Sequence, residues 1–233
     1  MVKALIALSS YDGAFYDDGS KTGVYFVEAY HPWEYFHKQG VDVTFISETG
    51  TFGWDEHSIA DSALQGEEKK VYDDSNSAFN KAVQGVKKPS DVKASDYDIF
   101  LAAGGHGAAF DFPKAEGLHK LAAELYANGK AVAAVCHGPL IFDNWKSASG
   151  ETIIRGKKIT GFSDDGEKQL GVVEAMKKYG LSTPREAAER NDALYVEPPA
   201  PWEAFVVVDG NLISGVNPAS ATKTAEKSLA VVS

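Results

Sequence analysis

The stretch AVAAVCHGPL, residues 131–140, carries the pattern that decides the fold. Its first part, Ala131–Val135, is apolar without alternation, which is typical of a strand covered on both faces of a parallel sheet. A glycine and a proline that can open a helix follow within a few residues. A sharp strand-to-helix turn around a nucleophile has small residues two before and two after it, here Ala134 and Gly138. The stretch therefore predicts an α/β sheet with Cys136 at the carboxyl end of a strand, where such sheets bind ligands.

Three further apolar runs predict buried strands of the same kind: Ala4–Leu8, Val41–Ile46 and Ile99–Ala103. Helical patterns lie between them, over Thr22–Lys38 and over Pro113–Asn128. The second helix has proline at its start and Asn-Gly at its end, the usual asymmetry of helix termini. Because strands and helices alternate, the sequence predicts a mostly parallel sheet with helices on both faces.

The rest of the chain predicts additions to this core. Residues 204–215 indicate two strands joined by an Asp-Gly turn, and residues 217–232 a closing helix. Another helix is expected over Asp164–Lys178. Residues 49–95 are polar and long for a simple connection, so we expect a small insertion with a short helix, acting as a lid. No repeat or low-complexity linker divides the chain, and residues 1–233 are interpreted as a single domain.

Composition limits the class of protein. The chain has 233 residues, a formal net charge of −10 and 44% hydrophobic residues, which predicts a packed globular protein. The acidic balance argues against nucleic acid and anionic membranes as partners. One cysteine cannot form an internal disulfide, and the apolar run near the N-terminus is too short for a membrane span. We therefore expect a cytoplasmic protein, with the nucleus as an additional compartment.

Cys136 has two interpretations. A cysteine in an apolar strand is most often a buried structural residue. At the start of a helix, however, the helix N-terminus favours the thiolate and lowers the pKa of the thiol. The small flanking residues favour this second interpretation, a nucleophile. The glycine-rich segment GGHG, residues 104–107, ends the preceding strand and could offer backbone N–H groups to an oxyanion beside Cys136.

A cysteine nucleophile needs a histidine, and the chain has none after His137. The candidates are therefore His137 and His106. An orienting carboxylate is expected from the segment after another short strand, where Asp164, Asp165 and Glu167 are alternatives. The acidic first turn of a helix would give the same composition there.

Glu28 is a carboxylate in an otherwise apolar helical pattern. A buried carboxyl group has a raised pKa and can transfer protons near neutral pH. The spacing of Glu28 alone, however, favours a side chain that faces solvent.

Six segments together resemble one known group, the fungal heat-shock branch of the PfpI-like superfamily, over nearly the whole chain. These segments are SSYDGAFYDDGSKTGVYFVEAYHPWEYF (9–36), SETGTFGWDEHS (47–58), AAGGHGAAFDFPKA (102–115), AAVCHGPLIFDN (133–144), ITGFSDDGE (159–167) and SGVNPASA (214–221). The resemblance implies a flavodoxin-like α/β sandwich like that of class I glutamine amidotransferases, and a homodimer. Its fungal members are glutathione-independent glyoxalase III enzymes.

The resemblance also implies roles for individual residues. Cys136 matches the nucleophile, His137 its partner and Glu167 the carboxylate that orients this histidine. Glu28, in VEAYHP, matches a glutamate beside the thiol, which reverses the expectation from its spacing.

The GGHG segment matches the part of the site that holds substrate. Gly105 is the position whose backbone N–H helps to hold the oxyanion, and His106 is expected to bind substrate beside it. The sequence departs only slightly from the pattern of the fungal relatives. Leu140 is bulkier than the alanine that is usual there, which affects the expected shape of the pocket.

The reaction implied by the resemblance is methylglyoxal plus water to lactate, without cofactor or metal. The substrate is a small 2-oxoaldehyde, and Cys136 would bind it as a hemithioacetal. Glu28 and His137 are alternative bases for the proton transfer. Other functions implied by the superfamily are a stress-protective holdase chaperone, and a deglycase or peptidase that uses the same thiol.

Overall fold

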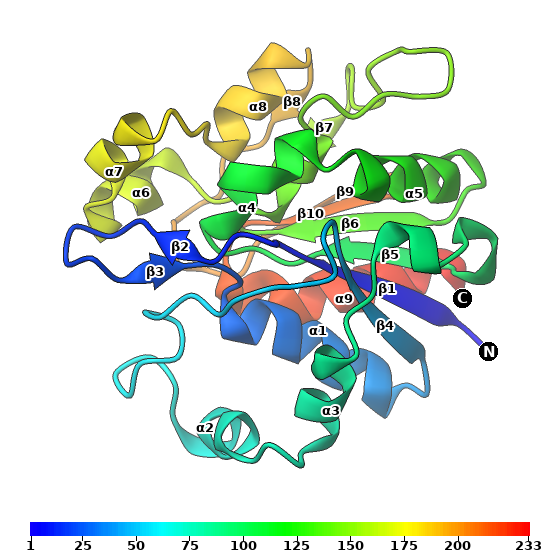
Figure 1. The fold of residues 1–233 in the computed structure, drawn as a ribbon. Helices are drawn as coiled ribbons and strands as arrows, with labels where there is room; N and C mark the ends of the chain where they lie inside the picture. Colours follow the sequence, from blue (N-terminus) through cyan, green and yellow to red (C-terminus); the bar gives the residue numbers. More distant parts are fainter.

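The computed structural model describes residues 1–233, and the expected α/β fold is confirmed (Figure 1). A six-stranded sheet forms the centre of the molecule. In spatial order its strands are β4 (Asp42–Ser47), β1 (Lys3–Leu8), β5 (Ile99–Ala102), β6 (Ala131–Val135), β10 (Leu212–Gly215) and β9 (Val206–Asp209). All neighbours are parallel except β10 and β9, the hairpin expected from the Asp-Gly turn. All four predicted buried strands are therefore present, with ends shifted by at most one residue.

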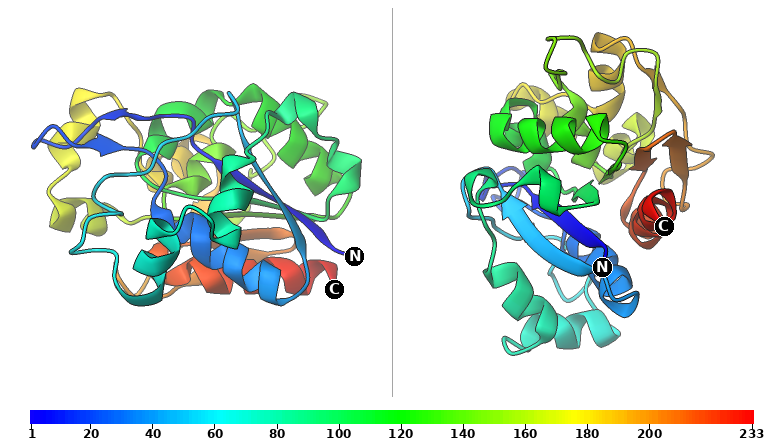
Figure 2. Two further views of the ribbon diagram at one scale, coloured as in Figure 1. Left: turned by 60° about the horizontal axis from the view of Figure 1, so that its bottom comes forward. Right: turned by 90° about the vertical axis from the view of Figure 1, so that its right-hand side faces the viewer.

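Helices cover both faces of the sheet, and the two faces are separated clearly in Figure 2. Helices α1 and α9 pack on one face and α5 on the other. The helices are α1 (Phe26–Lys38), α2 (Gly66–Asp73), α3 (Ala78–Gln84), α4 (Gly107–Asp111), α5 (Glu116–Ala127), α6 (Asp164–Leu170), α7 (Val173–Lys178), α8 (Pro184–Arg190) and α9 (Ala221–Val232). None of them is both long and apolar enough to cross a membrane.

Apolar and polar residues do not alternate along the strands, because each face of the sheet packs against its own apolar core. In β1, Leu5 belongs to the core under α5, and the next residue, Ile6, belongs to the core under α1 and α9. The same division separates Phe100 from Leu101 in β5. All four side chains are fully buried, as expected for a sheet between two layers of helices.

Four predicted helices have different boundaries. The first begins at Phe26, because Thr22 is paired in the short strand β3 (Lys21–Thr22), opposite β2 (Gly13–Ala14). The helix expected from Pro113 begins with a separate 3-10 turn before α5. The helix expected over Asp164–Lys178 is divided into α6 and α7, because Gly171 is left-handed with φ +71° and ends α6. The closing helix expected over residues 217–232 begins at Ala221, after a 3-10 turn over Pro218–Ser220. In a second small pair, β7 (Lys158–Ile159) is the short strand expected before the acidic segment, and β8 (Leu194–Tyr195) was not predicted.

The segment 49–95 carries two α-helices instead of the one expected. Of these, α3 packs against β4 and α1, and α2 packs against α3, at one edge of the sheet (Figure 1). Trp54 forms a bridge with Val24, and from this segment only His57 lines the cavity described below. The lid function therefore stays a prediction, and His57 is the residue through which this segment reaches the cavity.

The topology places a crevice beside the residues of interest. From β1 the chain passes through α1 to β4 on one side, and then crosses to β5 on the other side. The strand order therefore reverses between β1 and β5. In parallel sheets the carboxyl ends of strands at such a reversal form the usual ligand-binding crevice. The GGHG segment follows β5, and Cys136 follows β6.

Candidate active site

Cys136 lies in the sharp turn that the sequence predicts. Its φ is +61°, a left-handed conformation that few non-glycine residues adopt and that clusters at functional sites. The turn is fixed on both sides, because Cys136 N donates to Gly215 O at 2.9 Å and Phe162 N donates to Cys136 O at 2.8 Å. The helix that follows is a 3-10 helix, Gly138–Phe142, instead of an α-helix.

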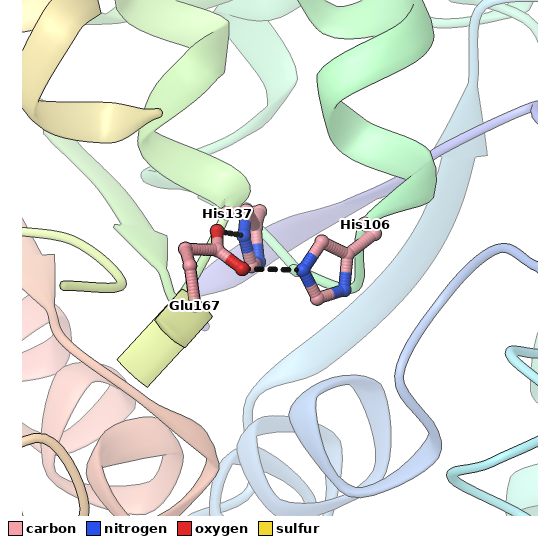
Figure 3. Close-up of side chains that lie close together, drawn as sticks. All are labelled: His106, His137 and Glu167. Carbon is pink, nitrogen blue, oxygen red and sulfur yellow. Dashed lines mark hydrogen bonds and ion pairs between the residues drawn. The ribbon is translucent and has the colours of Figure 1, made fainter. Parts of the chain in front are cut away.

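A chain of hydrogen bonds leads away from the thiol. Cys136 Sγ lies 3.4 Å from His137 Nδ1, and His137 Nε2 donates to Glu167 Oε1 at 2.6 Å. The other carboxylate oxygen, Oε2, accepts from His106 Nε2 at 2.8 Å. Figure 3 shows the Glu167 carboxylate beside the two imidazole rings, with one oxygen joined to a nitrogen of His137 and the other to a nitrogen of His106. The structure thus brings together all four residues, which the sequence placed in three separate segments.

The structure also separates the three candidate carboxylates. Asp164 accepts a hydrogen bond from Arg185, and Asp165 pairs with Lys168 at the surface. Only Glu167 faces the histidines, because the N-cap Ser163 starts α6 in the register that turns Glu167 inward. Its side chain is buried, so that the carboxylate depends on the two imidazoles for hydrogen bonds.

Burial and neighbouring charges determine the protonation states of Glu167 and His137 in this chain of hydrogen bonds. Burial opposes ionisation of Glu167, but the neighbouring His137 and His106 hold its pKa well below the usual range. Burial lowers the pKa of His137, and the charge of His106 lowers it further. We therefore describe the resting state as an ionised Glu167 beside a neutral His137, which is the state that can accept a proton.

The expectation of a low thiol pKa is wrong for the resting site. Burial raises the pKa of Cys136 well above its usual value, and the charge of Glu28 raises it further. A five-residue 3-10 helix offers too small a dipole to offset these effects. The resting residue is therefore a thiol, and a reaction at its sulfur would need a neighbouring base to take the proton.

Glu28 is fully buried, as the resemblance implies and as its spacing did not. It lies in the first turn of α1 beside Cys136, and both residues line the same cavity. Neither carboxyl oxygen has a hydrogen-bond partner of normal geometry, so burial raises the pKa of Glu28 to about 8. Gly104 makes the close approach possible, because a Cβ at this position would overlap Glu28 Oε2 and would come within 2.8 Å of Cys136 Cβ.

The cavity next to Cys136 is small and mostly apolar. Its volume is about 150 Å³. Cys136, Glu28, His106 and His137 contribute its reactive groups. Gly105 also lines it, with φ +101° and an N–H that no acceptor in the protein uses. The apolar part of the wall consists of Tyr16, Tyr25, Phe162, Leu170, Val172 and Trp202.

Sequence reasoning missed several residues of this wall. Tyr16 comes from the β2–β3 loop, donates to the buried Asp55 at 2.7 Å, and stacks on His57 with ring centroids 3.7 Å apart. Trp202 lies far along the chain and is 47% exposed at the cavity. No local pattern marks these residues, because each reaches the cavity through contacts between distant segments.

The donor atoms of His106, His137 and Glu167 lie within 4.8 Å of one another, a spacing at which side chains can hold a metal ion. All of these atoms take part in the hydrogen bonds described above. The arrangement is complete without an ion, so we interpret it as a proton-transfer chain.

The raised pKa of Glu28 predicts a specific dependence of stability on pH. Above its ordinary pKa of 4.5 the unfolded chain loses this proton, whereas the folded protein keeps it up to about pH 8. The free energy of unfolding should therefore fall across this interval, by at most about 1.4 kcal/mol per pH unit from this group. Urea unfolding of wild type and Glu28→Gln at about pH 5 and about pH 8 measures the effect.

Comparison of wild type with Glu28→Gln controls for all other titrating groups, because the two proteins share them. We expect Glu28→Gln to gain stability relative to wild type as the pH rises. A difference between the two proteins that stays constant with pH would show that Glu28 has an ordinary pKa in the folded state.

Comparison with known proteins places these features in a family. Residues 20–230 match the model of the DJ-1/PfpI family. The chain is 52% identical to Glyoxalase 3 of Candida albicans over 99% of this chain and 98% of that protein. It is 50% identical to Glutathione-independent glyoxalase HSP31 of Saccharomyces cerevisiae, over 97% and 96% of the two chains.

Solved structures agree with the sequence comparison. The crystal structure of glyoxalase III from Candida albicans matches with a TM-score of 0.96, covering 100% of this chain and 98% of that one. The Rapid Encystment Protein 24 KDa of Francisella tularensis matches with a TM-score of 0.88 at 27% identity, over the full length of both chains. The similarity thus extends over the core sheet, the segment 49–95 and the turn that holds Cys136, and the chain belongs to the DJ-1/PfpI family.

Proposed function

We propose that this protein is a glutathione-independent glyoxalase that converts methylglyoxal and water to lactate. The observation that carries the proposal is the buried carboxyl group of Glu28 beside the Cys136 thiol, in a cavity sized for a small substrate. A thiol can hold the aldehyde, and a carboxyl group with a pKa of about 8 can carry a proton between two carbon atoms near neutral pH. Relatives that are about half identical carry the name glyoxalase.

In the first step the thiol adds to the aldehyde carbon, C1. Sulfur forms the bond to C1, the thiol proton passes to His137 Nδ1, and the carbonyl oxygen becomes an oxyanion. The 3.4 Å distance between Sγ and Nδ1 supports this transfer. The unused N–H of Gly105 is the proposed donor to the oxyanion, a contribution of about 10²–10³-fold for one donor.

The second step moves a proton within the bound substrate. A base removes the hydrogen of C1 and an enediolate forms. The proton returns at carbon C2, and the C2 oxygen takes the proton held by His137, which gives a thioester of lactate. Water then cleaves the thioester, which releases lactate and restores the thiol. The sum is methylglyoxal plus one water to one lactate, so no electron acceptor is needed. We assign the base role to the ionised form of Glu28, which is a minor form near neutral pH at a pKa of about 8, since His137 holds the thiol proton after the first step.

The proposal is tested by a lactate assay with purified protein, methylglyoxal, no glutathione and added chelator. Lactate formed at a rate proportional to enzyme supports it. Absence of lactate, or dependence on glutathione or on an ion that the chelator removes, would overturn it.

Replacement of Glu167 by glutamine should slow turnover, with the thiol still reactive. An amide has one acceptor oxygen, so it cannot accept from both His137 and His106 as the carboxylate does. We expect turnover about 10- to 100-fold lower, the usual range for a residue that orients a reacting side chain. The measurements are lactate formation and the rate of Cys136 alkylation by iodoacetamide. Asp165→Asn, at the surface, is the matched control, and equal rates for both variants would remove Glu167 from the mechanism.

Two further expectations belong to the same proposal, the homodimer implied by the resemblance and the cytoplasmic location expected from the composition. We propose that the protein is a homodimer and that it acts in the cytoplasm. Light scattering of the purified protein measures the first, and fluorescence microscopy of the tagged chain the second. A monomer over the working concentration range would contradict the dimer.

A further inference from the structure

His106 holds a position that the mechanism above leaves unused. It follows β5 within the GGHG turn, it is 5% exposed, and its Nε2 donates to Glu167 Oε2 at 2.8 Å. This contact makes Glu167 an acceptor for two imidazoles instead of one (Figure 3).

The ring of His106 packs against two other rings. It stacks on Phe15 with centroids 4.8 Å apart, and it is tilted by 41° relative to His137 with centroids 4.0 Å apart. The backbone is fixed as well, because Gly107 N donates to Gly23 O and Tyr25 N donates to Gly104 O. A ring that is packed in this way presents one edge to Glu167 in a constant direction.

The hydrogen bonds determine where the protons lie. An ionised carboxylate can only accept, so both Nε2 atoms must carry hydrogen. A neutral His137 with hydrogen on Nε2 has a free lone pair on Nδ1, which is the atom that faces Cys136 Sγ. With the opposite tautomer, Nδ1 would carry hydrogen and could not accept the thiol proton.

We propose that His106 is a positioning residue: its hydrogen bond to Glu167 Oε2 holds the carboxylate so that Oε1 fixes the Nε2–H tautomer of His137 and leaves Nδ1 free for the Cys136 proton. The inference rests on the proposed function only for its effect on turnover. If Glu167 lost its second donor, it could rotate about its terminal bond, and the direction of the His137 contact would no longer be fixed.

This role differs from the substrate-binding role that the sequence suggested for His106. The Nε2–H of His106 is already used in the hydrogen bond to Glu167. The backbone N–H of Gly105 has no acceptor in the protein, so it remains the available donor for an oxyanion.

Two variants of similar shape separate the hydrogen bond from the side chain. His106→Leu removes the donor, and His106→Gln supplies an amide N–H that reaches the same region as Nε2. We expect kcat of His106→Leu to fall about 10- to 100-fold with KM within about threefold, and we expect His106→Gln to recover most of that loss. The alkylation rate of Cys136 by iodoacetamide should follow the same order, with the thiol still reactive in each variant as in Glu167→Gln, and this rate does not depend on the glyoxalase reaction.

Nitrogen-15 NMR of the imidazoles tests the tautomers directly in the wild-type protein, whatever its activity. We expect both His106 and His137 as Nε2–H tautomers, and we expect His137 of His106→Leu to show a mixture. The proposal is overturned if either wild-type ring is the Nδ1–H tautomer or if His106→Leu raises only KM, as for a substrate contact. It is also overturned if His106→Gln is as slow as His106→Leu. Failure of the lactate assay alone would overturn the proposed function and leave the tautomer result standing.

Discussion

Replacing Cys136 with alanine is expected to reduce lactate formation to the rate of the uncatalysed reaction. Without sulfur no hemithioacetal can form, and His137 and Glu28 then have no bound substrate to act on. A loss of at least about 10³-fold is expected, because removing a nucleophile abolishes the whole covalent route. The assay is lactate production in the absence of glutathione. Turnover above about a tenth of wild type would remove Cys136 from the nucleophile role.

The fold should tolerate this change. The sulfur borders an existing cavity, so that its removal enlarges a space instead of opening a new void in the packed core. Circular dichroism and the thermal midpoint of unfolding check this point. The same inactive variant also tests the chaperone alternative. If it still suppresses aggregation of a client protein, that activity is separate from the thiol chemistry.

Glu28→Gln is expected to slow turnover at least about 10²-fold and to leave the thiol reactive. Glutamine keeps the size of the side chain and fits the space beside Gly104, but an amide cannot accept the C1 proton. The expected loss corresponds to the lower end of a general-base contribution, about 2.7 kcal/mol in the activation free energy.

Two measurements distinguish the base from a structural support. Lactate formation reports the proton transfer, and alkylation of Cys136 reports the thiol. If Glu28→Gln loses both lactate formation and Cys136 alkylation, Glu28 supports the thiol. If it loses lactate formation alone, Glu28 is the base. Near-normal turnover would move the base role to His137.

Much of the fold could be predicted from local patterns. The apolar runs identified four of the five strands that pair in parallel in the central sheet, β1, β4, β5 and β6, because strands buried on both faces are mostly apolar. The Asp-Gly turn identified the β9–β10 hairpin. Helix boundaries were less accurate where a tertiary contact competes with local preference. Thr22, for example, is drawn into a strand and donates its hydroxyl to the buried Asp55.

For the candidate site, too, local patterns predicted one part and the structure explained the other. The small residues around Cys136 marked the turn in the sequence itself, because the sharp bend excludes larger side chains. The choice of Glu167 over Asp164 and Asp165 came from the resemblance, since composition left the three equal. The structure supplies the physical reason, which is that only Glu167 turns inward when Ser163 starts α6.

By itself, then, the sequence determined the α/β sheet, the strand-end position of Cys136 and the family resemblance. Local hydrogen bonding and side-chain periodicity act over a few residues, so they can be recognised in the order of polar and apolar residues along the sequence. Only the tertiary structure decided the burial of Glu28, the raised pKa of the thiol and the contact of His106 with Glu167. These properties arise where distant segments meet and exclude water. In that environment a neighbouring charge and the loss of solvation outweigh the preferences of the local sequence.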